Sequence, residues 1–165
     1  LRFEEDFAFF KTHFNAKNSS NTSFLIEEYL RGIIYIYRDP RDVCVSWARY
    51  SGISNEKSLK FLLDKNSHIK WTGNINFGNY DKNIPVYISS WHEHLKSWTE
   101  NNSDCPKLFI KYEDLVYHKR DTLIKIINFF YKNFNIKITN QEKKVENIIK
   151  TTEFKYMQKM ESRLI

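Results

Sequence analysis

Cysteine is scarce in this sequence. Only Cys44 and Cys105 occur in 165 residues, and they form no pair with the spacing of metal ligands. Two cysteines also do not make the disulfide framework that stabilises small secreted domains. We therefore expect a reducing, cytoplasmic setting, with neither a cysteine-bound metal nor a disulfide scaffold.

Long apolar runs and a leader segment are absent as well. No stretch approaches the roughly 20 apolar residues that a membrane helix needs. The first residues include Arg2, Glu4, Glu5 and Asp6, which do not form the charged-then-apolar pattern of a signal peptide. The chain has no initiating methionine and opens on a strand-like run, so we expect it to begin inside a larger domain. Its length suits one domain with a real core.

The net charge of +6 is spread along the chain. A basic balance can indicate a nucleic acid, an acidic membrane surface or a small anionic ligand. Here lysines are mixed with asparagine and isoleucine, and the aromatic residues fall mostly at periodic positions expected in a core. A nucleic-acid module needs a basic face with exposed stacking aromatics. We therefore expect no nucleic-acid partner and no membrane partner.

Apolar runs alternate with helical patterns along the chain. This alternation predicts an α/β fold with a largely parallel sheet, in which ligands bind at the carboxyl ends of the strands. Ligand-binding or catalytic residues are therefore expected just after the strands, at His13, Arg38 and Tyr112. The predicted strands are 7–14, Ile33–Tyr37 and 107–112. The predicted helices are 23–30, Pro40–Ser51, 55–66, 87–100, 120–134 and 141–150, the last with a further turn to about residue 160. Residues 67–85 are predicted to form a long loop.

The turn after the second predicted strand has the features of an anion site. Asp39 is a good N-cap, Pro40 suits the first helical position, and Asp42 can complete a box-like cap. A helix N-terminus favours an anion, and Arg38 adds a planar fork that suits phosphate oxygens. Ser46 lies about two turns into the helix, where its hydroxyl can join the site. The alternative is a capped helix in which Arg38 pairs with Asp39 or Asp42.

This segment is similar to a motif of the sulfotransferases that use 3′-phosphoadenosine 5′-phosphosulfate (PAPS). The motif is a hydrophobic strand followed by Arg, a short polar trio, Asp, Val and Ser. Arg38, Asp42, Val43 and Ser46 are all in register with it. In the family the Arg and the Ser bind the 3′-phosphate of the donor, so the resemblance implies these roles for Arg38 and Ser46. Asp42 is assigned to the helix cap.

Lys11-Thr12-His13 resembles a second family motif. It lies at the end of a predicted strand, with His13 placed 25 positions before Arg38. A lone histidine is usually structural, but the family histidine is the catalytic base. Neutral imidazole, with a pKa of about 6.5, suits removal of the acceptor's proton. The resemblance implies that role for His13 and stabilisation of developing charge for Lys11, while Thr12 is interpreted as structural.

Two further segments carry weaker similarity. Residues 90–98 resemble a family helix, and Trp91, Leu95 and Trp98 share one face that core packing explains. His92 and His94 do not face the same way, so a metal site there is not expected.

The strand 108–112 resembles the family strand that ends in Tyr-Glu-Asp, and the resemblance implies that Tyr112 lies near the adenine. Glu113 and Asp114 point apart and are interpreted as structural.

The last similar segment surrounds Thr152. Thr152, Phe154 and Met157 correspond to family residues around the adenine, although Glu153 replaces a usual small residue. Phe154 and Met157 share a helical face, so plain packing is the open alternative.

The resemblance runs from about Phe10 to Met157 and implies a fold like that of the P-loop NTPases, with helices flanking a parallel sheet. The family's opening phosphosulfate loop and its late Arg-Lys-Gly segment have no counterpart here. We therefore expect a single, partial sulfotransferase domain over residues 1–165, incomplete at its N-terminus. These residues alone are expected to be inactive or nearly so.

The leading hypothesis is transfer of a sulfuryl group from PAPS to a small-molecule or glycan hydroxyl, or to an amine. The product nucleotide is adenosine 3′,5′-bisphosphate (PAP), and no metal is needed. The alternative from another class is a family member that binds a nucleotide or partner without catalysis. A nucleotide kinase would leave Lys11-Thr12-His13 without a role. The predicted loop 67–85, with Trp71, Phe77 and Tyr80, is expected over the acceptor site.

Overall fold

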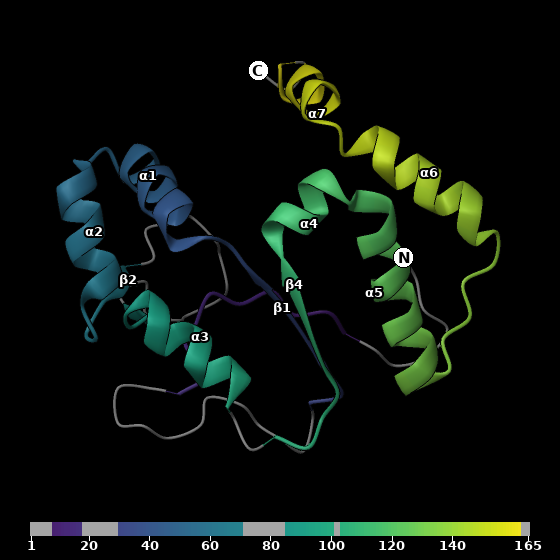
Figure 1. Cartoon of the computed structure of the whole chain (residues 1–165), viewed down its shortest axis with the longest axis horizontal. Helices are drawn as coiled ribbons and strands as arrows, with labels where there is room; N and C mark the ends of the chain where they lie inside the picture. Colours follow the sequence, from purple (N-terminus) through teal and green to yellow (C-terminus); the bar gives the residue numbers. More distant parts are fainter. Residues whose placement is uncertain (1–7, 18–29, 71–84, 101–102, 163–165) are drawn as a thin grey trace, which may run out of the picture. The chain divides into compact units, whose positions relative to one another are not determined.

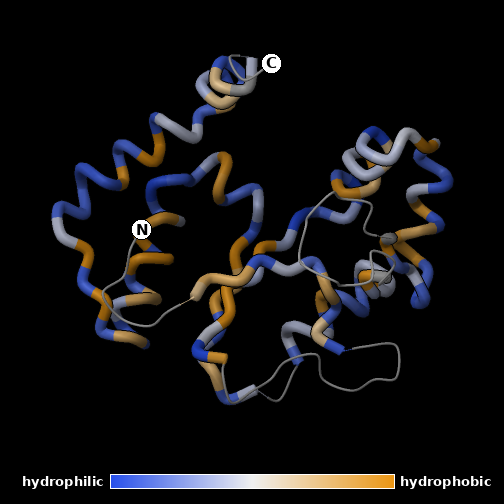
Figure 2. The backbone as a smooth tube through the Cα atoms, turned by 180° about the vertical axis from the view of Figure 1, so that it is seen from behind, coloured by the Kyte–Doolittle hydropathy of each residue, from blue (hydrophilic) through white to orange (hydrophobic). Residues whose placement is uncertain are grey.

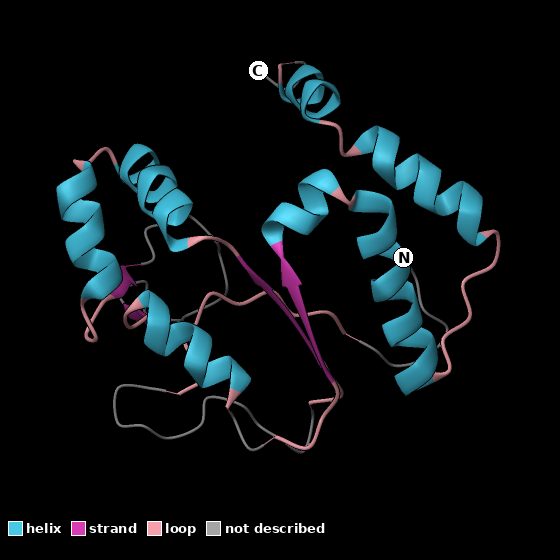
Figure 3. Cartoon of the chain, viewed as in Figure 1, coloured by secondary structure: helices cyan, strands magenta, loops and turns pink. Residues whose placement is uncertain are grey.

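The elements alternate along the chain in the computed structural model, which describes residues 8–17, 30–70, 85–100 and 103–162 (Figures 1 and 3). In chain order they are β1 (Ile33–Tyr37), α1 (Pro40–Ser51), α2 (Asn55–Leu63), β2 (His68–Lys70), β3 (Pro85–Tyr87), α3 (Trp91–Thr99), β4 (Lys107–Lys111), α4 (Tyr112–Tyr117), α5 (Lys119–Phe134), α6 (Gln141–Thr151) and α7 (Phe154–Glu161). They fall into two units. The first unit is Leu1–Tyr29 with Asp39–Ser103, and the second is Leu30–Arg38 with Asp104–Ile165.

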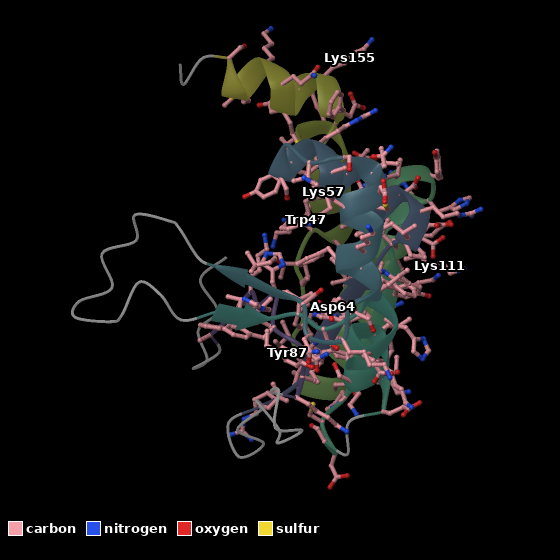
Figure 4. All side chains as sticks on the ribbon, turned by 90° about the vertical axis from the view of Figure 1, so that its left-hand side faces the viewer. Trp47, Lys57, Asp64, Tyr87, Lys111 and Lys155 are labelled. Atoms are coloured by element: carbon pink, nitrogen blue, oxygen red, sulfur yellow. The ribbon has the colours of Figure 1, made fainter. Side chains whose placement is uncertain are left out.

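In the first unit α1 and α2 pack against each other. Trp47 of α1, labelled in Figure 4, stacks on Phe61 of α2 with ring centroids 5.1 Å apart. Ser58 is fully buried between the helices, and its hydroxyl donates to the carbonyl oxygen of Cys44 at 2.7 Å. Helix α1 ends because Gly52 adopts a left-handed conformation, with φ of 63°, which glycine tolerates without strain.

The first unit also contains a short antiparallel pair and helix α3. Strands β2 and β3 pair in the register His68 with Tyr87. Tyr87, labelled in Figure 4, donates its hydroxyl proton to the carbonyl oxygen of Lys65 at 2.9 Å. Helix α3 begins after Ser90, whose hydroxyl accepts a hydrogen bond from the backbone N–H of Glu93.

In the second unit β1 and β4 form a parallel pair. The register runs from Ile33 opposite Lys107 to Tyr37 opposite Lys111. Gly32 precedes β1, and a Cβ atom at that position would lie 2.8 Å from the Phe134 ring of α5. The absence of a side chain at Gly32 therefore lets α5 approach the start of the strand closely.

Helices α5 and α6 of the second unit are tied by charge and by packing. Arg120 pairs with Glu142 at 2.6 Å and with Glu146 at 3.4 Å. Val145 of α6 is 1% exposed, and Figure 2 shows hydrophobic residues alternating with hydrophilic ones along this helix. Val145 of α6 is therefore buried, while Glu142 and Glu146 of the same helix pair with Arg120 of α5.

Several expected elements differ from those observed. Residues 8–14 form no strand, and Phe9 and Phe10 are 64% and 87% exposed, so the predicted buried strand 7–14 is wrong. The expected loop 67–85 contains β2 and the start of β3. The helix expected from residue 87 begins only at Trp91, because Ser89 has a φ of 67° that no helix continues through.

Other outcomes concern helix ends. Helix α2 ends at Leu63 rather than at residue 66, and the short helix α4 directly after β4 was not expected. Asn140 occupies the N-cap position of α6, but in a left-handed conformation and without a side-chain cap hydrogen bond. The predicted helix 23–30 and the residues Trp71, Phe77 and Tyr80 lie outside the described residues.

Candidate active site

Arg38 and Tyr112 meet at the carboxyl edge of the parallel pair. Each follows its strand directly, and Tyr37 and Lys111 are register partners. The guanidinium carbon of Arg38 lies 4.7 Å from the centroid of the Tyr112 ring, a cation–π arrangement. Tyr112 remains 41% exposed. The structure thus brings two of the predicted nucleotide-binding residues together where ligands bind in open parallel sheets.

The start of α1 is fixed by Asp39, as its sequence predicts. The carboxylate accepts hydrogen bonds from the backbone N–H of Arg41 at 2.9 Å and from Nη2 of Arg41 at 2.6 Å. The side-chain hydrogen bond from Arg41 lowers the pKa of Asp39 to about 2, and the backbone hydrogen bond acts in the same direction. An arginine–carboxylate pair therefore does form at this helix start, and its arginine is Arg41.

Ser46 lies on α1 with an exposed side chain. Asp42 is also exposed, in the first turn of the same helix. Ser46 belongs to the first unit, whereas Arg38 belongs to the second. A shared contact of Arg38 and Ser46 with one phosphate remains a prediction.

The Lys11-Thr12-His13 segment exposes its two ionisable side chains to solvent. The side chains of Lys11 and His13 are exposed, whereas Thr12 is half-buried. The Thr12 hydroxyl accepts a hydrogen bond from the backbone N–H of Phe14 at 3.0 Å, which supports its structural interpretation. The imidazole of His13 is therefore open to solvent.

The backbone that carries His13 is held by α3. Nε2 of His94 lies 3.3 Å from the carbonyl oxygen of His13, and the indole N–H of Trp98 donates to the carbonyl of Phe14 at 3.1 Å. Burial lowers the pKa of His94 below its ordinary value. Trp98 is 5% exposed, so the expectation of core packing holds for its ring, but its N–H also has a specific partner.

Thr152 closes helix α6 and is already hydrogen-bonded within the chain. Its hydroxyl donates to the carbonyl of Ile148 at 2.6 Å. Nζ of Lys119 donates to the Thr152 hydroxyl at 3.1 Å and to its carbonyl oxygen at 3.0 Å. Lys119 is a contact that sequence reasoning did not identify, because nothing local to residue 119 indicates a partner at residue 152.

Phe154 and Met157 lie on α7 with their side chains open to solvent. Phe154 is 74% exposed and Met157 is 48% exposed. Core packing within the described part of the chain therefore does not account for Phe154. An exposed aromatic ring suits stacking on a flat ligand, as the predicted adenine contact requires.

Within residues 8–17, 30–70, 85–100 and 103–162, no group of three or more His, Cys, Asp or Glu side chains is arranged to hold a metal ion. Over the same ranges, no helix combines the length and apolar character needed to cross a bilayer.

A parallel pair with an arginine at its carboxyl edge, followed by a capped helix, places this chain among the α/β proteins. Residues 2–164 match the profile of the family described as "Sulfotransferase domain". The chain belongs to this family, and its fold is that of a sulfotransferase domain.

Similarity to individual proteins agrees with this membership. The amine sulfotransferase of Oryctolagus cuniculus is 28% identical over 125 residues, which cover 76% of this chain and 36% of that protein. Human sulfotransferase 1E1 is 30% identical over 129 residues, which cover 76% of this chain and 37% of that protein. The chain thus spans little more than a third of the length of these curated relatives.

A solved structure supports the fold. The crystal structure of mouse sulfotransferase SULT7A1 complexed with PAP superposes with a TM-score of 0.56 and 23% identity. The superposition covers 86% of this chain and 45% of that one. The predicted α/β fold, with helices around a parallel sheet, is therefore confirmed.

Proposed function

We propose that this chain carries part of a site that transfers a sulfuryl group from PAPS to a hydroxyl or amine acceptor. Family membership supports the reaction class. The names of two relatives, an amine sulfotransferase and a 3-beta-hydroxysteroid sulfotransferase, span the two acceptor classes. In this proposal the two units form one domain, and the donor supplies the sulfuryl group without help from a metal.

The nucleotide end of the proposed site is built on Arg38 and Tyr112. The guanidinium of Arg38 lies over the Tyr112 ring, and in the proposal its N–H fork binds the 3′-phosphate in a bidentate manner. In the proposal the Ser46 hydroxyl donates to the same phosphate, and the partly exposed Tyr112 ring lies beside the adenine. The position of Arg38 over Tyr112 at the carboxyl edge is the observation that carries the proposal.

The far side of the adenine is assigned to Thr152, Phe154 and Met157. The exposed ring of Phe154 offers a stacking face. The Thr152 hydroxyl donates its single proton to the carbonyl oxygen of Ile148, so toward a ligand it can act only as a hydrogen-bond acceptor. That polarity suits the amino group of adenine, which is a donor.

The reacting end of the proposed site contains His13 and Lys11. As the acceptor oxygen or nitrogen bonds to sulfur and the bond from sulfur to the phosphate oxygen breaks, the imidazole of His13 takes the acceptor's proton. Lys11, exposed two residues earlier, supplies a positive charge for the oxygens that gain negative charge. Both side chains are open to solvent and therefore reachable by an acceptor.

The nucleotide assignment is tested by calorimetry with PAP. Arg38→Ala should weaken PAP binding about tenfold to a hundredfold, because a hydrogen-bonded ion pair to phosphate is lost. Arg38→Lys should recover only part, since an ammonium lacks the planar fork. Arg49→Ala, which removes an exposed charge from α1, is the matched control and should bind as the parent does. Equal affinity of Arg38→Ala and the parent would show that the assignment is wrong.

The catalytic assignment is tested by turnover of the full-length protein, because residues 1–165 alone are expected to be inactive or nearly so. His13→Ala should lower kcat by about a hundredfold or more, because a positioned general base contributes factors of that order. His92→Ala, which removes an exposed histidine from α3, controls for loss of any imidazole. Unchanged kcat in His13→Ala would exclude it as the base. PAP binding without turnover in the parent would instead identify a nucleotide-binding protein without catalysis.

A further inference from the structure

Helix α3 offers three side chains to one short segment of backbone. His94, Ser97 and Trp98 have the i, i+3, i+4 spacing that places residues on one face of a helix. Their partners are the carbonyl of His13, the N–H of Ala16 at 3.1 Å and the carbonyl of Phe14. Helix α3 thus holds, through three side-chain contacts, the backbone at the end of the Lys11-Thr12-His13 motif and just after it.

The same segment is held from β3. The backbone N–H of Asn15 donates to the carbonyl of Tyr87 at 2.9 Å, and the Asn15 side-chain amide donates to the carbonyl of Ile88 at 3.4 Å. Asn15 and Ala16 are 4% and 1% exposed. The backbone from His13 to Ala16 is therefore fixed on both sides, while the His13 side chain stays exposed.

His94 is the member of this set that contacts His13 itself. A carbonyl oxygen only accepts hydrogen bonds, so Nε2 of His94 must carry a proton. Burial lowers the pKa of His94, which favours the neutral ring. A neutral ring with its proton on Nε2 donates to the His13 carbonyl.

We infer that α3 is a clamp that positions His13, with His94 as the positioning residue. The inference rests on the proposed role of His13 as the base. A base is effective only within hydrogen-bond reach of its proton, and a shift of about 1 Å can cost a hundredfold in rate. Ser97 and Trp98 are buried and anchor the segment in the first unit. His94 is half-buried and sets the peptide from which the His13 side chain projects.

The test compares matched variants of one helix, each made in the full-length protein. His94→Ala should lower kcat about tenfold to a hundredfold and leave the KM for donor and the affinity for PAP within about twofold. His94→Gln should recover most of the kcat, because its amide N–H can donate to the same carbonyl. His92→Ala, two residues away with an exposed side chain, should match the parent. Trp98→Phe keeps a ring but loses the N–H, and should lower kcat in the same way.

Amide hydrogen exchange gives a readout that does not need turnover. Exchange at Phe14, Asn15 and Ala16 should be faster in His94→Ala and return toward the parent rate in His94→Gln. Parent-like kcat and exchange in His94→Ala would overturn the clamp, as would a Gln variant no better than the Ala variant. If His13→Ala keeps full turnover the proposed base is wrong, and the exchange rates then decide separately whether α3 holds the segment.

Discussion

At the scale of single residues, two arginines near the start of α1 have different tasks. The side chain of Arg41 is 89% exposed and pairs with Asp39, which caps the helix. Arg38 stacks on Tyr112, which lies far away in the sequence. The sequence spacing alone did not decide the partner of Arg38, because the carboxylates of Asp39 and Asp42 follow it closely in the sequence. The register of β1 with β4 decides the position of Tyr112, and that register is not a local property.

The hydroxyl of Ser58 gives a prediction at the same scale. Ser58 is 0% exposed and donates to the carbonyl of Cys44, so it joins α2 to α1. Ser58→Ala leaves that carbonyl without this donor and should lower the free energy of unfolding by about 1 kcal/mol. Urea denaturation measures the change. Ser51→Ala, at the exposed end of α1, is the control, and equal losses in the two variants would show that the buried hydrogen bond contributes nothing.

At the scale of elements, local signals predicted the bounds that they control. Helix α1 was expected at Pro40–Ser51 and is found there, because Asp39 and Pro40 begin it and Gly52 ends it. Strand β1 was also predicted with its observed bounds, since a continuous β-branched and aromatic run seldom has another interpretation. Arg38 and Asp39 join these two elements in the sequence, at the turn where the anion site is predicted.

Elements that depend on distant partners were predicted poorly. The apolar run at Phe9 and Phe10 resembles a buried strand, but both side chains are exposed, and the residues that follow bond to α3 side chains and to the backbone of β3. Strands β2 and β3 are three residues each, too short for a clear alternation pattern. Helix α4 begins at Tyr112 without the side-chain cap that would mark its start in the sequence.

The candidate site shows the same division. Arg38, Ser46, Lys11 and His13 were identified through family motifs, which are local in sequence. His94 was considered in the sequence only as a possible metal ligand and Lys119 was not considered, because the partners of their positioning contacts lie 81 and 33 positions away. Positioning contacts of this kind carry no local pattern and emerge only from the folded chain.

At the scale of the whole molecule, stability should depend on pH through His94. Its pKa in the folded state lies below the ordinary histidine value of about 6.5, chiefly because of burial and also because of the nearby charge of His13. Between the two pKa values the unfolded chain binds more protons than the folded chain. The free energy of unfolding should therefore fall as pH drops below about 6.5, until the folded pKa is reached.

Urea denaturation at about pH 7.5 and about pH 5.5 measures this effect. His94→Gln removes the titrating ring and should show a smaller loss of stability at the lower pH than the parent. His92→Gln, changed at an exposed histidine, should keep the parent's pH dependence. An identical loss in His94→Gln and the parent would show that this ring does not control the response.

The division into two units adds a constraint on the whole chain. The second unit contains Leu30–Arg38 and resumes only at Asp104, so Asp39–Ser103 of the first unit is inserted between its parts. The hydrogen bonds that hold His13 lie within the first unit.

The parallel pairing of β1 with β4 also determines an order of events during synthesis. Strand β1 leaves the ribosome long before Lys107–Lys111 is made, because parallel partners need a long connection. Until then its apolar run has no partner strand in the second unit, and closing so long a loop is slow. Ile33–Tyr37 is thus an apolar segment that needs protection from aggregation until Lys107–Lys111 is made.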